Sequence, residues 1–216
     1  SVSSSNEDAV AVRNINSTNN LYTTIRVDQL AEAAYMNSSD AITADTSFDP
    51  DGLLVDERSK LTTDFTSNTF TIQAINADGT LGNEISFTID PNTDSLNSVL
   101  ARINASDAGV IAFYDEHTGK VSLTAKNTGD VNGDAEIKLN GDFLTGSLNL
   151  ANDNITAGVN GKEGKNAKFQ INGLDTERTS NTFQINGFEY TLKQVTDDGD
   201  QVTQPGELVT ITSQVD

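Results

Sequence analysis

The stretch Asn92–Gly129, NTDSLNSVLARINASDAGVIAFYDEHTGKVSLTAKNTG, carries the strongest local folding signal of this sequence. In its first half the apolar residues recur at i, i+3, i+4 and i+7, a spacing that places them on one face of a helix: Leu96, Val99, Leu100 and Ile103. Thr93 or Asp94 is expected to cap the start, because a short side-chain oxygen accepts a hydrogen bond from a free N–H of the first turn. The sequence therefore predicts an amphipathic helix near residues 94–105.

The second half of the stretch predicts a β-hairpin. Val110–Tyr114 and Lys120–Ala125 alternate apolar and polar residues around the polar segment Asp115–Gly119. Such alternation on both sides of a short, Gly-containing segment is typical of two antiparallel strands. We expect the helix and the hairpin to form one packed unit.

The composition extends this interpretation to the whole chain. The 216 residues are 35% hydrophobic and include no Trp and one Met, with many Asn, Thr, Ser, Asp and Gly residues, which favours short strands and turns over long helices. The expected fold class is mainly β with one or two short helices, an α+β minority, arranged as two β-rich domains of which one is inserted into the other. Further strands are expected at Ala9–Val12, Leu21–Val27, Thr69–Asn76, Glu84–Asp90, Glu136–Leu139, Glu189–Lys193 and Leu208–Thr212.

Three segments give weaker signals. Gln29–Met36 (QLAEAAYM) has helical propensity, although an irregular extended chain is the alternative. Ala44–Leu61 is expected to be mostly loop, Phe143–Ile155 to be strand and loop, and Val159–Gly164 to be a linker.

The C-terminal part contains an internal repeat. Phe169–Gly173 (FQING) recurs as Phe183–Gly187, and the longer phrase TSNTFxI occurs at both 66–72 and 179–185. Phe and Ile lie two residues apart and so share a strand face, while Asn-Gly supplies the positive φ angles of a tight turn. The repeat predicts two similar hairpins, through duplication or through convergent strand-turn sequences.

The charge of the chain limits its partners. The formal net charge is −19, and a surface so acidic repels nucleic acid and anionic membranes. No run approaches the length of about 20 apolar residues that a membrane-spanning helix needs. The absence of Cys excludes disulfides and thiolate metal sites.

The residues that could carry catalysis or metal binding form no convincing site. His117 is the only histidine, and it falls in the expected hairpin turn, where the rigid orientation that a Ser-His-Asp triad requires is rare. The acidic segments Asp130–Asp134 and Asp197–Asp200 only partly match the spacing of a Ca²⁺ loop. A glycosidase would need aromatic platforms that a chain without Trp lacks. We therefore predict no catalytic, cofactor-binding or metal-binding residue, and no enzyme.

Several stretches resemble the flagellar filament cap family, also called hook-associated protein 2. Ser95–Val110 and Gly119–Gly129 resemble the "IN" repeat that flagellins and hook-associated proteins share. Tyr22–Ala34 (YTTIRVDQLAEAA) and Gly164–Leu192 (GKNAKFQINGLDTERTSNTFQINGFEYTL) resemble the cap proteins in particular. The matches cover about half of the chain and follow the order of the family.

The resemblance implies a domain organisation. Residues 1–45 and 162–216 would form a discontinuous β-rich domain, called D2 in the family. Residues 46–161 would form an inserted distal β-rich domain, called D3, which contains the helix near 94–105. Cap proteins carry helical arms on both sides of these domains, so we expect the chain to be the excised outer part.

The resemblance also implies a role. It indicates a structural, non-enzymatic protein outside the cell at the tip of the bacterial flagellum, where cap subunits form a ring and promote flagellin insertion. Its expected partners are flagellin and other cap subunits, and the fragment alone is expected to be monomeric. Two alternatives remain: an adhesin-like module that binds host mucus glycoproteins (mucin), and another flagellar axial protein such as flagellin or a hook–filament junction protein.

Overall fold

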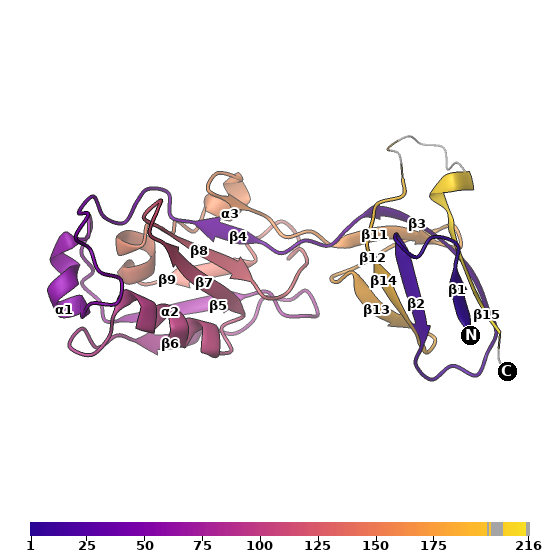
Figure 1. Cartoon of the computed structure of the whole chain (residues 1–216), viewed down its shortest axis with the longest axis horizontal. Coiled ribbons are helices and arrows are strands. Elements are labelled where there is room, and N and C mark those ends of the chain that lie inside the picture. Colours follow the sequence, from indigo (N-terminus) through magenta and orange to yellow (C-terminus); the bar gives the residue numbers. More distant parts are fainter. Residues whose placement is uncertain (198, 200–204, 215–216) are drawn as a thin grey trace. The chain divides into compact units, whose positions relative to one another are not determined.

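The computed structural model describes residues 1–197, 199 and 205–214. The chain forms two compact units (Figure 1): unit 1 consists of Ser1–Glu32 and Lys165–Asp216, and unit 2 consists of Ala33–Gly164. The chain thus leaves unit 1 once, builds unit 2 from one continuous segment, and returns. Among the described residues, the two buried cores have no residue in common.

Unit 1 is a pair of antiparallel sheets. A five-stranded sheet has the order β1-β15-β3-β11-β12, and a three-stranded sheet has the order β13-β14-β2. The strands are β1 (Val2–Ser4), β2 (Val10–Asn14), β3 (Leu21–Gln29), β11 (Ala167–Ile171), β12 (Leu174–Arg178), β13 (Thr182–Ile185), β14 (Phe188–Leu192) and β15 (Val209–Ser213), and a 3₁₀ turn covers Pro205–Glu207.

Stacked aromatic rings join the two sheets of unit 1. Phe183 of β13 stacks on Phe169 of β11 with ring centroids 4.8 Å apart, and on Tyr190 of β14 at 5.7 Å. The guanidinium of Arg178 lies over both phenylalanine rings, 5.9 Å from the centroid of Phe169 and 5.6 Å from that of Phe183. This stack stabilises the core of unit 1, which contains no tryptophan, because stacked rings add to the free energy gained by burial.

Unit 2 combines two antiparallel sheets with short helices. The sheets have the orders β10-β4-β8-β7 and β6-β5-β9. The strands are β4 (Tyr35–Asn37), β5 (Thr69–Ala74), β6 (Ile85–Thr88), β7 (Val110–Asp115), β8 (Lys120–Ala125), β9 (Ile137–Asn140) and β10 (Gly161–Lys162), and the helices are α1 (Leu54–Glu57), α2 (Leu96–Ala105) and α3 (Asn154–Ala157). In the described ranges, no helix has the length and apolar character that crossing a membrane requires.

The amphipathic helix and the hairpin predicted from the sequence are confirmed as α2 and β7–β8. All four residues of the predicted apolar face are buried. The predicted cap is wrong, however, because Ser95 occupies the N-cap and its hydroxyl accepts the Ser98 N–H at 2.9 Å. Asp94 lies one residue earlier, where its carboxylate binds Arg102 at 2.8 Å instead of capping the helix.

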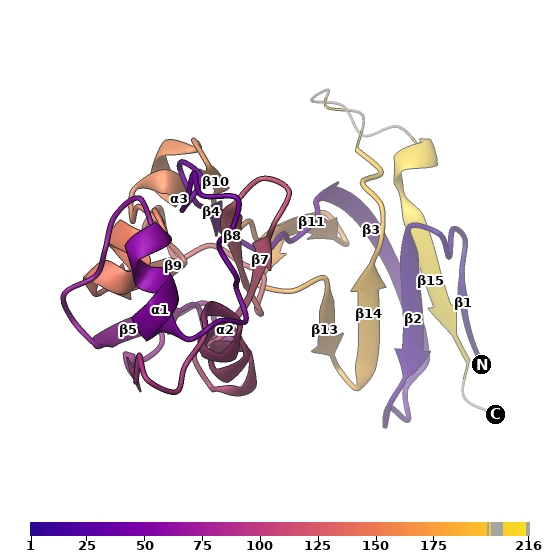
Figure 2. The same cartoon turned by 60° about the vertical axis from the view of Figure 1, so that its left-hand side comes forward.

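The FQING repeat forms two equivalent hairpins, β11–β12 (Figure 1) and β13–β14 (Figure 2). Asn172 and Gly173 have φ angles of +50° and +80°, and Asn186 and Gly187 have +52° and +82°. Two successive positive φ angles define the tight turn that matches the twist of a hairpin, as the sequence predicts.

The longer TSNTFxI phrase also has the same structure in both copies. In each copy the Ser hydroxyl accepts an N–H two residues later, from Thr69 at 3.2 Å and from Thr182 at 3.1 Å. The Phe that follows stacks on the aromatic residue directly opposite on the next strand, as Phe70–Phe87 in unit 2 and Phe183–Tyr190 in unit 1. In both units, therefore, the first strand of a hairpin begins with the same sequence and makes the same contacts.

Replacing Gly187 by alanine is expected to destabilise unit 1 more than replacing Gly173. The similar φ angles mean that alanine costs about 1 kcal/mol of backbone strain at either position. A Cβ on Gly187 would lie 3.0 Å from the backbone nitrogen of Ser17 and 2.5 Å from Asn16 Oδ1, whereas a Cβ on Gly173 meets nothing within 4 Å. Urea unfolding of both variants should therefore differ by about 1 kcal/mol or more, and equal losses would contradict the structure.

At Gln29–Met36 the helix does not form, and the extended alternative is confirmed. β3 continues to Gln29, Glu32 pairs with Lys165 through N–H···O bonds of 3.0 and 3.1 Å, and β4 follows at Tyr35. Local propensity is outweighed because sequence-distant strands satisfy the backbone groups of this segment and because Ala31, Ala34 and Met36 are buried.

One further expectation is corrected, and another is refined. Phe143–Ile155 contains a π-helical turn at Phe143–Ser147 and the helix α3, instead of a strand. Ala44–Leu61 contains α1 and a 3₁₀ turn at Arg58–Lys60 within the expected loop. These helical pieces are one turn long, so they leave no 3.6-residue periodicity in the sequence.

The boundaries of the units differ from the expected positions after residues 45 and 161. Residues 33–45 lie in unit 2, where Met36 and Ile42 are fully buried and β4 pairs with β8. The expected linker at Val159–Gly164 includes β10, which pairs with β4. The chain therefore passes from unit 1 to unit 2, and back again, next to the Glu32–Lys165 bridge.

Candidate interaction surfaces

His117 lies exposed in the turn between β7 and β8. The adjacent Asp115 carboxylate accepts hydrogen bonds from the N–H (3.0 Å) and the hydroxyl (2.6 Å) of Thr118. These bonds hold the pKa of Asp115 below its ordinary value and engage its carboxylate within the turn. No described residue forms a hydrogen bond or an ion pair with the His117 side chain, so no triad geometry is present in this part of the structure.

In the acidic segments that partly match Ca²⁺ loops, the aspartate carboxylates interact with N–H groups or a lysine close by in the sequence. Asp130 accepts the Gly133 N–H at 3.1 Å, and Asp134 forms an ion pair with Lys138 at 2.7 Å. Of the second segment, Asp197 accepts the Gly199 N–H, while Asp198 and Asp200 lie outside the described residues. Within the described ranges, no group of three or more His, Asp or Glu side chains could hold a metal ion.

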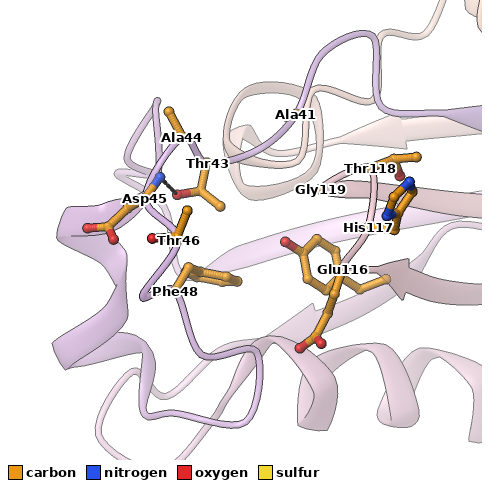
Figure 3. Close-up of a pocket in the computed structure, with 11 residues that line it drawn as sticks. Ala41, Thr43, Ala44, Asp45, Thr46, Phe48, Glu116, His117, Thr118 and Gly119 are labelled. Carbon is orange, nitrogen blue, oxygen red and sulfur yellow. Dashed lines mark hydrogen bonds between the residues drawn. The ribbon is translucent and has the colours of Figure 1, made fainter.

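A cleft of about 420 Å³ opens in unit 2 between the loop 41–48 and the turn 116–119. Figure 3 shows Thr43–Phe48 on one side and Glu116–Gly119 on the other. The two walls are joined by the Ile42 N–H, which donates to the Gly119 carbonyl at 2.8 Å. Gly119 has φ +67°, and a Cβ there would lie 3.1 Å from the Ala41 Cβ. Glycine therefore permits the close approach at the base of the cleft.

Aromatic rings and uncharged polar groups give the cleft its chemistry. The rings of Phe48 and Tyr114 meet edge to face, with centroids 5.9 Å apart and an interplanar angle of 77°. Burial raises the pKa of Tyr114, and the carboxylates of Glu116 and Asp115 raise it further, so its phenol is neutral at physiological pH. The Tyr114 hydroxyl forms no hydrogen bond with any described residue. The cleft therefore offers an apolar ring edge beside the Tyr114 hydroxyl, and its two carboxylates, Asp45 and Glu116, disfavour anions.

A second surface lies on the open face of the β4–β8–β7 sheet. Tyr35, Ile111 and Phe113 are 38%, 46% and 57% exposed. Ile111 of β7 and Tyr35 of β4 lie on either side of Thr124 of β8. Two residues further along the same face, Phe113 lies opposite Ser122. Sequence reasoning predicted the hairpin but missed this patch. The signal was Val110–Tyr114 (VIAFY), where the expected alternation of apolar and polar residues is wrong because all five residues are apolar. A strand that is apolar on both faces presents one apolar face outward when only the other is covered.

These features define a class of protein: a discontinuous β-sandwich domain that carries an inserted β-rich domain, with an acidic surface and open contact faces. Comparison of the sequence with protein-family models and with curated proteins finds no match. The fold does match solved structures.

Solved structures with a similar fold include flagellar cap proteins. The D2–D3 domains of FliD from Escherichia coli superpose with a TM-score of 0.67 at 22% sequence identity, covering 100% of this chain and 98% of that one. The D2–D3 domains of FliD from Serratia marcescens give 0.62 at 21%, covering 89% and 96%. FliD (HAP2) from Pseudomonas aeruginosa PAO1 gives 0.59 at 19%, covering 96% and 85%.

These likenesses establish that the chain has the fold of flagellar cap D2–D3 domains. The mainly β fold class expected from the sequence is confirmed. For the longer D1-D2-D3 structure from Escherichia coli, the chain covers 56% of its length.

Proposed function

We propose that this chain forms the outer domains of a flagellar filament cap, with unit 1 as D2 and unit 2 as D3. The observation that carries the proposal is the match to an isolated D2–D3 pair, which covers 100% of this chain and 98% of that one. In this chain, unit 2 is inserted into unit 1. A fold alone does not fix a function. The sequence resemblance at Tyr22–Ala34 and Gly164–Leu192, both partly in unit 1, supports the same assignment independently.

In this role the chain is structural, acts outside the cell at the filament tip, and contacts flagellin and other cap subunits. The open sheet face with Tyr35, Ile111 and Phe113 supports a role in contacts between proteins, because exposed apolar patches mark such surfaces. The net charge of −19 supports solubility in an extracellular setting.

A domain replacement tests the proposal. Cells that lack their cap protein receive FliD of Escherichia coli in which D2–D3 is replaced by this chain, joined at its two ends. We expect filaments and swimming to return at least in part, whereas this chain expressed alone should restore neither. The proposal would be overturned if the chimera is secreted and folded but no filaments form, or if the chain alone restores them.

The isolated chain is expected to be a monomer in solution. Repulsion between copies that each carry a charge of −19 opposes association, and physiological salt only partly screens it. Light scattering at micromolar concentration should give a mass near 23.0 kDa. A stable multimer under these conditions would show that the outer domains assemble without further segments.

A second candidate function is binding of extracellular glycans such as those of host mucin. The specific observation in its favour is the cleft of unit 2, where the Phe48 and Tyr114 rings lie beside the Tyr114 hydroxyl. Aromatic edges and neutral hydrogen-bonding groups suit sugars. In a glycan array, Phe48→Ala should abolish a saturable signal that the wild type gives, while Phe113→Ala on the sheet face should keep it. Absence of any saturable signal from the wild type would remove this candidate.

A further inference from the structure

The chain contains five Asn-Gly pairs, at residues 132–133, 140–141, 160–161, 172–173 and 186–187. Glycine has no side chain to shield its nitrogen, so the nitrogen of a Gly after Asn can attack the Asn side-chain amide. We propose that the Asn132–Gly133 turn is a modification site at which the folded protein deamidates spontaneously, ahead of the other four pairs.

The chemistry requires only water. The Gly133 nitrogen forms a bond to Asn132 Cγ and loses its proton to water, water returns a proton to Nδ2, and the Cγ–Nδ2 bond breaks to release ammonia. The product is a five-membered succinimide. Water then opens either of its two C–N bonds, which yields aspartate or isoaspartate at position 132. No electrons are transferred, and the net change is an amide exchanged for a carboxylate.

The backbone conformation does not single out this pair. Asn132 and Gly133 have φ angles of +55° and +84°, close to the values at Asn172–Gly173 and Asn186–Gly187. The attack needs the turn to open from this conformation, because nitrogen and Cγ must approach each other. The rate in the folded protein therefore depends on what holds each turn in place.

Among the described residues, Asn132 and Gly133 themselves form no hydrogen bond with a sequence-distant segment. Gly133 donates to Asp130, Asp134 donates to Val131 at 3.3 Å, and Val131 donates to Glu136 at 3.3 Å. The first point that distant segments hold is the buried Glu136, four residues after Asn132, whose side chain accepts the Gly164 N–H and whose carbonyl accepts the Ile75 N–H. The Asn132–Gly133 peptide can therefore open while Glu136 stays in place. Asn132 is exposed, and a Cβ on Gly133 would meet nothing within 4 Å.

Sequence-distant contacts hold the two FQING turns. The Asn172 side chain accepts the Thr24 N–H at 3.1 Å, and the Asn172 N–H donates to the Thr24 carbonyl at 2.9 Å. The Gly187 carbonyl accepts the N–H groups of Ile15 and Asn16 at 2.8 and 3.2 Å.

The remaining two pairs are also held by distant segments. Asn140 pairs with Thr71 in the β5–β9 ladder. The Asn160 carbonyl accepts the Asn37 N–H at 2.8 Å, and Gly161 pairs with Met36 in β10–β4. Each hydrogen bond that must break before attack should slow the reaction about fivefold.

Modification at position 132 would affect Gly164, the last residue of unit 2, through Glu136. The buried Glu136 side chain accepts the Val131 N–H with one oxygen and the Gly164 N–H with the other, at 2.6 Å. Isoaspartate lengthens the backbone next to Val131 and adds a negative charge near Glu136. The hydrogen bond that fixes Gly164, the last residue of unit 2, would therefore be weakened as the protein ages.

Peptide mapping by mass spectrometry tests the proposal on the unaltered chain. After incubation at 37 °C and neutral pH, the fraction of each Asn-Gly peptide that has gained about 1 Da is followed over time. We expect the Asn132–Gly133 peptide to react about fivefold or more faster than any of the other four. Similar rates at all five pairs, or a faster reaction at another pair, would overturn the proposal.

Two controls separate the effect of structure from that of sequence. In concentrated urea the five pairs should react at similar rates, because the tethers are gone; a persistent lead of Asn132 there would assign the preference to local sequence and contradict the proposal. Asn132→Gln should prevent the slow appearance of a more acidic species in isoelectric focusing. It should also preserve amide protection at Gly164, which the aged wild type is expected to lose.

Discussion

Phe143→Ala is expected to lower the free energy of unfolding of unit 2 by about 3–5 kcal/mol, the cost of removing a fully buried phenylalanine. The Phe143 ring is completely buried, and it packs against Phe65 and Phe70 with centroid distances of 5.1 and 5.8 Å. The π-helical turn that carries Phe143 is short, so it cannot move far to close the resulting cavity. Amide hydrogen exchange read residue by residue should show loss of protection in β5, β8 and β9.

The same variant tests whether the units unfold separately. Because the buried cores of the described residues do not overlap, protection in β3 and β11 of unit 1 should remain at the wild-type level. Phe188→Ala, which removes a buried ring from unit 1, should give the reciprocal result. Loss of protection in both units from either substitution would contradict the division into two cores.

Asp94→Asn is expected to destabilise unit 2 by about 2 kcal/mol at pH 7, since a buried carboxylate loses its charge-assisted hydrogen bonds with the partly exposed Arg102. Both carboxylate oxygens of Asp94 accept hydrogen bonds from Arg102, at 2.9 and 2.8 Å, and the carboxylate also accepts the Asp90 N–H. Through these contacts, chiefly those with Arg102, the pKa of Asp94 is lowered from 3.8 to about 2.

The lowered pKa predicts the pH at which this stabilisation disappears. The folded pKa lies below the unfolded one, so the ionised carboxylate stabilises the fold above pH 4 by about 2 kcal/mol, and the contribution is lost as the pH falls from about 4 to about 2. Urea unfolding of the wild type and of Asp94→Asn should therefore converge towards pH 2. A constant difference across this range would show that Asp94 acts by packing alone.

Glu189→Gln provides the matched control for the ion pair. Glu189 binds Arg13 at 2.9 Å, but the Arg13 side chain is 70% exposed, and an exposed pair contributes little to stability. The unfolding curve of this variant should coincide with that of the wild type throughout the pH range.

The elements that could be predicted from the sequence are those whose signal is local. The face of α2 and the Asn-Gly turns of the two FQING hairpins depend on spacing and on the φ preferences of single residues. The sequence could not decide between helix and extended chain at Gln29–Met36, because Lys165 and β8 hold this segment from far along the chain. The choice of Ser95 over Asp94 as cap depended on Arg102, which binds Asp94.

The candidate surfaces were harder to predict than the fold. The cleft brings residues 41–48 to residues 114–119, a pairing that no sequence period indicates. The exposed sheet face was encoded in the run VIAFY, but the sequence does not show which face of β7 is covered by α2. The pKa of Tyr114 likewise depends on burial that only the fold creates.

The most direct test of the proposed role is the position of the protein on the cell. Antibodies raised against this chain would be applied, with gold labels, to intact bacteria that produce the protein, and viewed by electron microscopy. The account predicts label at the distal ends of flagellar filaments. Label along the whole filament, label at the hook–filament junction, or flagella without label while the protein is present would contradict it.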